Sequence, residues 1–99
     1  MNPTPEIDFL FQAILSLRNT DECHVFFDDL LTIRERYDMS QRFQIALQLF
    51  RGESYEKISQ CTGASSATIS RVSRCLTEGT GGYATVLHHL SISPTEKES

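Results

Sequence analysis

The sequence predicts an all-α fold of about six helices, organised as a single domain over residues 1–90 with a flexible tail over residues 91–99. Apolar residues recur at spacings of three and four along most of the 99-residue chain, and no segment alternates as a β-strand does. Hydrophobic residues make up 39% of the sequence, a smaller share than globular domains usually contain. One copy therefore has a thin core, which a homodimer would enlarge by burying apolar surface between copies.

Two amphipathic helices are expected in the N-terminal part of the chain. The first covers residues 6–18, where the apolar residues fall at helical spacing. Asn19 or Thr20 is placed to cap the second, because such side chains accept hydrogen bonds from the free amides at a helix N-terminus. Asp21 and Glu22 would then lie at the positive end of that helix.

Further helices are expected on both sides of residue 60. Thr32 and Glu35 have the spacing of a capping box, which predicts a short third helix. Ser40 is expected to cap a fourth helix, which Gly52 ends by adopting the left-handed backbone conformation. A glycine-rich break at residues 79–82 precedes a last short helix.

Residues 54–77 carry the pattern of a helix-turn-helix, two short helices joined by a tight turn. Ile58 is expected to face the second helix, Gly63 to supply the positive φ that the turn needs, and Ile69 and Val72 to return to the core. A plain helical hairpin is the alternative interpretation of the same spacing.

Charge is distributed unevenly along the chain, whose net charge is −4. Residues 1–40 carry three cations and eight carboxylates, whereas residues 41–76 carry five cations and two carboxylates. The segment from Ser65 to Leu76 contains no carboxylate. An acidic half joined to a basic half suggests a nucleic-acid partner, although two differently solvated surfaces would give the same composition.

The outer face of the second helix in residues 54–77 has the chemistry of a DNA contact. Ala67 can touch a thymine methyl, and Ser70 can hydrogen-bond to base edges. Arg71 and Arg74 can bind guanine or phosphate. Basic and hydroxyl-bearing residues nearby can bind the DNA backbone, which orients the protein without reading sequence. A solvated arginine face is the alternative. The candidate DNA-binding residues are Arg51, Tyr55, Lys57, Ser65, Ser66, Ala67, Ser70, Arg71 and Arg74.

Three motifs resemble the Trp repressor superfamily: residues 49–53 (LFRGE), 62–64 (TGA) and 67–71 (ATISR). Residues 79–83 (GTGGY) make the chain similar to the small bacterial Trp-repressor-related regulators rather than to the Trp repressor itself. The resemblance implies an intertwined homodimer that binds double-stranded DNA at a palindromic operator and represses transcription.

The resemblance also locates a candidate effector site at Gln44, Arg71 and Cys75. In the Trp repressor two arginines sandwich the indole beside a glycine. Here one of those arginines is replaced by Gln44, the glycine by Val72 and a ligand-contacting serine by Cys75. Tryptophan is therefore not expected to be the corepressor, and whether another small-molecule effector acts stays open.

Other chemistries find little support in the sequence. The histidines lack metal-ligand spacing, the glycine-rich segment lacks the Lys-Ser/Thr pair of a P-loop, and no nucleophile can be paired with a base. We therefore expect no metal, no cofactor and no enzymatic activity. A protein-interaction module that uses its helix-turn-helix only for packing is the rival interpretation.

The cellular setting follows from the cysteines and the N-terminus. Three cysteines without a C-x-x-C pair favour a reduced cytoplasmic protein, although a redox role for Cys61 or Cys75 stays open. The first residues do not resemble a signal peptide, and no apolar run is long enough to cross a membrane.

Overall fold

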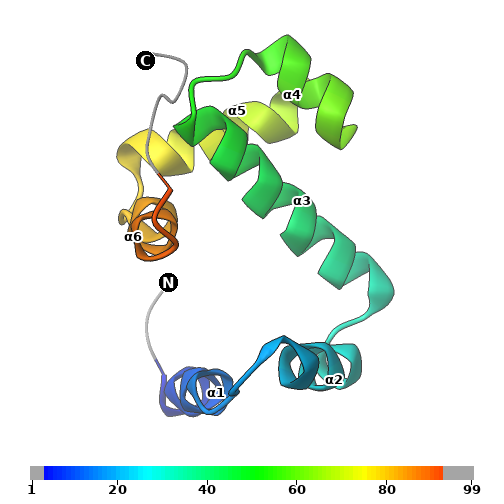
Figure 1. Cartoon of the computed structure of the whole chain (residues 1–99), viewed down its shortest axis with the longest axis vertical. Helices are drawn as coiled ribbons and strands as arrows, with labels where there is room; N and C mark the ends of the chain where they lie inside the picture. Colours follow the sequence, from blue (N-terminus) through cyan, green and yellow to red (C-terminus); the bar gives the residue numbers. More distant parts are fainter. Residues whose placement is uncertain (1–3, 93–99) are drawn as a thin grey trace. The chain divides into compact units, whose positions relative to one another are not determined.

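Six α-helices joined by short turns make up most of residues 4–92, which are the residues that the structure, a computed structural model, describes (Figure 1). The all-α prediction with about six helices is thus confirmed. The predicted tail lies outside the described residues except for Ser91 and Ile92. The helices are α1 (Pro5–Leu15), α2 (Thr20–Leu30), α3 (Ile33–Phe50), α4 (Tyr55–Thr62), α5 (Ser66–Glu78) and α6 (Gly82–His89).

Two compact units divide the chain, the first ending at Arg36 and the second beginning at Tyr37. In the first unit, the Thr4 hydroxyl caps α1 by accepting from the Ile7 amide at 3.1 Å. Asn19, one of the two caps expected, accepts from the Glu22 amide at 2.8 Å and so starts α2. Local capping therefore fixes where both N-terminal helices begin.

The helix α3 confirms one sequence prediction and corrects another. The capping box forms, since the Glu35 amide donates to the Thr32 hydroxyl at 3.0 Å and the Thr32 amide donates to the Glu35 carboxylate at 2.9 Å. The predicted new helix start at Ser40 is wrong, because one helix of 18 residues continues through that position. The stretch contains no glycine or proline, and extending an existing helix costs less than nucleating a second one.

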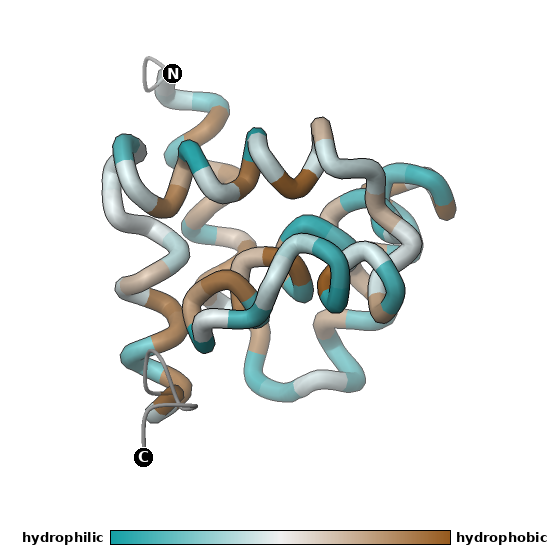
Figure 2. Tube along the Cα trace, turned by 90° about the horizontal axis from the view of Figure 1, so that it is seen from above, coloured by the Kyte–Doolittle hydropathy of each residue, from teal (hydrophilic) through white to brown (hydrophobic). Residues whose placement is uncertain are grey.

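The second unit is organised around a small apolar core. Gly52, with φ of +84°, lies in the left-handed region beyond the end of α3, as the sequence predicts. Apolar and hydrophilic residues alternate along the helices (Figure 2), so each helix has one face suited to burial. The buried cluster comprises Ile45 and Ala46 from α3, Ile58 from α4, Ala64 from the turn, and Ile69 and Val72 from α5.

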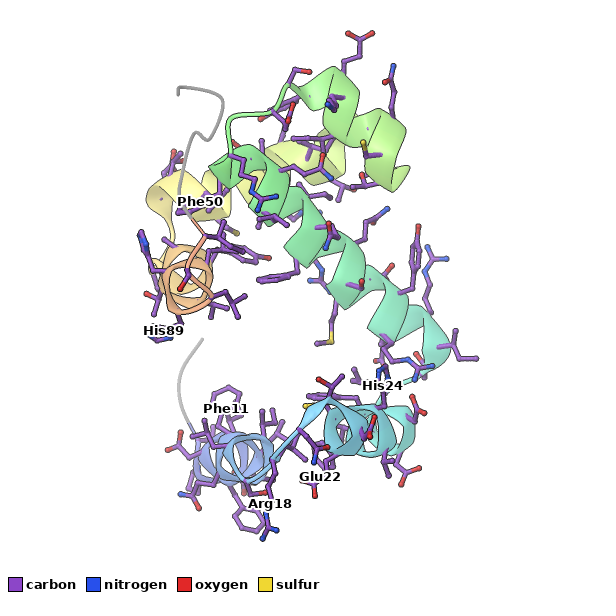
Figure 3. The ribbon with its side chains drawn as sticks, in the orientation of Figure 1. Phe11, Arg18, Glu22, His24, Phe50 and His89 are labelled. Carbon is purple, nitrogen blue, oxygen red and sulfur yellow. The ribbon has the colours of Figure 1, made fainter. Side chains whose placement is uncertain are left out.

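The helix α6 packs near the end of α3 in the same unit. The Phe50 ring meets the His88 ring edge-on with centroids 5.6 Å apart, and Figure 3 shows Phe50 directed toward α6. The Phe43 and Tyr83 rings lie 6.4 Å apart, and Leu87 is fully buried. These contacts hold α6 against the core that supports α4 and α5.

Candidate nucleic-acid interface

The helix-turn-helix predicted over residues 54–77 is formed by α4, α5 and the turn between them. Gly63 ends α4 with φ of +75°, and its amide donates to the Ser59 carbonyl at 2.8 Å. A side chain at this position would have to adopt a conformation that costs about 1–2 kcal/mol for any L-residue. Glycine at this position therefore permits the sharp change of direction between the two helices.

Two hydroxyl side chains hold the turn. The Ser59 hydroxyl donates to the Ala64 carbonyl at 2.9 Å. The Thr62 hydroxyl donates to the Ile58 carbonyl at 2.7 Å and accepts from the Ala64 amide at 3.2 Å. The amide and the carbonyl of Ala64, which lies between the two helices, are thus bonded locally, and the turn is fixed relative to α4.

The helix α5 has one buried face and one exposed face. Ile69 and Val72 are buried in the core, whereas Arg71, Arg74 and Ser70 are exposed. At 100° per residue the two arginines are separated by about 60° around the axis and about 4.5 Å along it. Both cations therefore lie on the same face of the helix, which also carries the exposed Ala67.

At the N-terminus of α5 the two candidate serines have different surroundings. The Ser65 hydroxyl caps the helix by accepting from the Thr68 amide at 3.2 Å, and it also lies 3.2 Å from the Thr68 hydroxyl. Ser66 is exposed at the first helical position. The first amides of a helix have no partner within the helix, so this end offers donors to an anion.

The three remaining candidate residues lie before or within α4. Tyr55 and Lys57 are exposed in its first turn, after the Ser54 hydroxyl, which caps the helix by accepting from the Lys57 amide at 3.2 Å. Arg51, just after the end of α3, is half-buried. Tyr55 and Lys57 are thus accessible to a ligand, and Arg51 is less so.

The candidate effector residues come from two helices. Gln44 on α3 is exposed, as are Arg71 and Cys75 on α5. Val72, which lies between Arg71 and Cys75 in the sequence, is buried in the core. An open, mainly apolar cavity of about 630 Å³ adjoins Cys75 and is lined also by Phe43 and Tyr83. The sequence did not predict this cavity, because its walls come from α3, α5 and α6.

Metal and disulfide chemistry receive no support from the described part of the chain. Among residues 4–92 no three His, Cys, Asp or Glu side chains are grouped so that they could hold a metal ion. Cys23, Cys61 and Cys75 are all free thiols. None of the helices that the structure describes is long and apolar enough to span a membrane.

The fold and the site together define a small all-α protein of the helix-turn-helix class, with an exposed cationic face on the second helix of the motif. The family model for the Trp repressor protein matches residues 5–91. The chain therefore belongs to the Trp repressor family.

Individual relatives agree over nearly the whole chain. The uncharacterized protein YerC of Bacillus subtilis (strain 168) is 48% identical over 94 residues, which cover 95% of this chain and 90% of YerC. A crystal structure described as a candidate Trp repressor from Staphylococcus aureus has a TM-score of 0.89 and 44% identity, covering 93% of this chain and 92% of that one. A TrpR-like protein from Eubacterium eligens ATCC 27750 has a TM-score of 0.88 and 47% identity, covering 91% and 93%.

Proposed function

We propose that this protein is a cytoplasmic, sequence-specific DNA-binding regulator that represses transcription as a homodimer on a palindromic operator. The observation that carries the proposal is the exposed face of α5, where Arg71 and Arg74 lie together opposite the buried Ile69 and Val72. Membership of the Trp repressor family suggests a DNA-binding regulator as well.

In the proposed complex α5 enters the major groove, which admits one α-helix. Ser70 and Ala67 face base edges, and Arg71 and Arg74 bind guanine or phosphate. The N-terminus of α5 at Ser66 receives a phosphate on its free amides. Other DNA backbone contacts come from Tyr55, Lys57 and Arg51, of which the first two are exposed.

The proposed dimer accounts for the apolar surface of the N-terminal helices. Neither α1 nor α2 contains a buried residue. Several large apolar side chains of these helices are exposed over most of their surface, among them Leu15 at 83% and Phe9 at 72% on α1 and Val25 at 66% on α2. Exposed apolar surface often marks a protein–protein interaction site, and in the proposed dimer a second copy covers it.

A dimer also supplies what one helix-turn-helix lacks. Two copies related by a two-fold axis contact half-sites one helical turn apart, roughly 34 Å, and the operator repeats that symmetry. The dimer carries a charge of 2 × −4 = −8, so long-range attraction to DNA is weak and binding depends on the local basic face. The interaction is therefore expected to weaken steeply as salt rises.

Tryptophan is not part of the proposed mechanism. The buried side chain of Val72 adds bulk where the family's ligand has a glycine beside it. The exposed Gln44 and Cys75 carry no charge that would replace the missing arginine. Selection of bound DNA with and without candidate metabolites would identify any other effector.

The test is to select bound sequences from a random pool of double-stranded DNA at low salt. We expect an inverted repeat with half-site centres about 10 base pairs apart. Sedimentation of the same preparation should give the mass of a dimer. A stable dimer that enriches no DNA sequence would refute the proposal and favour the rival function, a protein-interaction module that uses its helix-turn-helix for packing.

A further inference from the structure

We infer that Gln41 is a positioning residue that sets the orientation of the helix-turn-helix on α3. The inference rests on the proposed DNA-binding function. The side-chain amide of Gln41 donates to the Thr62 carbonyl at 3.0 Å, and the two residues are 21 positions apart in the sequence. Gln41 is not among the candidate DNA-binding residues, and it acts through the turn to which it donates.

The acceptor of this hydrogen bond belongs to the turn of the motif. Thr62 is the last residue of α4, and the last carbonyls of a helix have no donor within the helix. The Thr62 hydroxyl is already occupied with Ile58 and Ala64. Gln41 therefore supplies the C-terminal end of α4 with a donor that comes from outside the motif.

The donor is anchored on the helix that carries the core. Gln41 and Ile45 are four residues apart, so they lie on the same face of α3, and Ile45 is fully buried against α4 and α5. The Tyr37 hydroxyl, four residues before, lies 3.4 Å from the same Gln41 nitrogen. The amide of Gln41 thus lies one helical turn before the buried Ile45, at the edge of the helix-turn-helix.

The apolar contact of Ile45 and the hydrogen bond of Gln41 restrict different motions of the helix-turn-helix relative to α3. The apolar contact of Ile45 with Ile58 and Ile69 favours burial but has no preferred direction, so it tolerates small rotations of α4 and α5 about α3. A hydrogen bond is directional and weakens steeply when its angle changes. The bond from Gln41 to the turn therefore selects one tilt of α5 among those that the core allows.

The tilt of α5 relative to α3 matters because the two copies of a dimer contact the two half-sites of a palindromic operator at the same time. A change of one base pair between half-sites moves them by about 3.4 Å and turns them by about 35°. A dimer with both motifs held at one tilt discriminates against that change, whereas a dimer with loosened motifs tolerates it. Gln41 therefore determines how strictly half-site spacing is read.

The experiment compares the wild-type protein with Gln41→Met, which keeps the length of the side chain and removes the donor. Affinities are measured on the selected operator and on operators with one base pair inserted or deleted between half-sites. We expect Gln41→Met to bind the selected operator about three- to tenfold more weakly, the range that one net hydrogen bond represents. Its affinity for the altered operators should change little, so the preference for correct spacing shrinks by the same factor.

Two further variants separate positioning from a general loss of structure. Gln60→Met makes the same chemical change at an exposed site on α4 and should leave the spacing preference intact. Gln41→Lys restores a donor of sufficient length and should recover much of the preference. Thermal unfolding followed by circular dichroism normalises every affinity to folded protein, and if Gln41→Met is too unstable, Gln41→Leu removes the donor without adding a charge.

The outcomes distinguish this inference from the function on which it rests. A wild-type protein that binds no DNA overturns both the proposed function and the role of Gln41. A wild-type protein that discriminates spacing, together with a Gln41→Met variant that discriminates equally well, overturns only the role of Gln41. A variant that loses affinity equally for all three operators also overturns it, because the residue then acts on stability or on affinity alone.

Discussion

Replacing Arg71 and Arg74 by alanine, together and singly, tests the cationic face of α5 most directly. Both side chains are exposed, and no acidic residue lies in the first turn of α5. Their removal should therefore leave the buried face and the fold intact, because surface changes away from caps and cores usually alter stability by less than about 0.5 kcal/mol.

The magnitude follows from the count of cations. A dimer of the double variant lacks 2 × 2 = 4 arginines, and each phosphate contact contributes about 0.9 to the slope of log K against log salt. If all four bind phosphate, the slope becomes shallower by about 3.6. Between 50 and 200 mM salt the wild type should then lose about 150-fold more affinity than the double variant does.

The assay is a salt titration of operator binding by fluorescence anisotropy. Arg18→Ala is the matched control for each single variant, since it removes one exposed arginine from the segment between α1 and α2 (Figure 3). Its slope should equal that of the wild type. Each single variant should lower the slope by about 1.8 if its arginine binds phosphate.

A different pattern would assign the arginines to bases. An arginine that contacts guanine should cost about 1–3 kcal/mol on replacement and relax the preference at one operator position. Unchanged affinity, slope and sequence preference in the double variant would refute the reasoning, because no role at a DNA surface would then remain for Arg71 and Arg74.

The remaining predictions concern the residues that stabilise the helix-turn-helix and the absence of tryptophan binding. Gly63→Ala should destabilise the protein by about 1–2 kcal/mol in urea unfolding, because the backbone has φ of +75° while the space for a Cβ is open. Gly79→Ala should cost more, because a Cβ there would lie 2.4 Å from the Cys75 carbonyl oxygen; equal stability of the two variants would contradict this. Ile58→Ala should cost about 2–5 kcal/mol by leaving a cavity in the core, and a loss below about 1 kcal/mol would mean that the core collapses around it. Calorimetric titration with tryptophan should show no saturable binding at micromolar concentration, and a saturable isotherm would reverse that conclusion.

The sequence predicted the features whose causes are local. Asn19, Thr32 and Gly63 act on backbone groups within a few residues, so their caps and turns could be predicted from spacing alone and are confirmed. Ser40 shows the limit of the same reasoning. A serine is a good cap only where a helix begins, and Ser40 lies inside α3, which begins at Ile33.

Contacts that join distant segments were not predictable in this way. The bond from Gln41 to Thr62 needs the relative placement of α3 and α4, and nothing in the pattern around Gln41 singles it out from its neighbours. The cavity beside Cys75 depends likewise on three helices. For the candidate interface, the sequence predicted which residues of α5 would be exposed, whereas their contacts with DNA stay a prediction.

The segregation of charge bears on how the proposed regulator would find its site. Screening in physiological salt limits both attraction and repulsion between exposed charges to about 8 Å, so the face of α5 would attract DNA only at close range, and the acidic residues 1–40 would add no attraction. Non-specific binding arises almost entirely from phosphate contacts and should be weak for a dimer with a charge of −8. Base contacts by Ser70, Ala67 and the arginines then contribute a larger share of the affinity for the operator. Little of the protein would then be bound to non-operator DNA. The ratio of operator-bound to non-specifically bound protein would therefore be high, even with a modest absolute affinity for the operator.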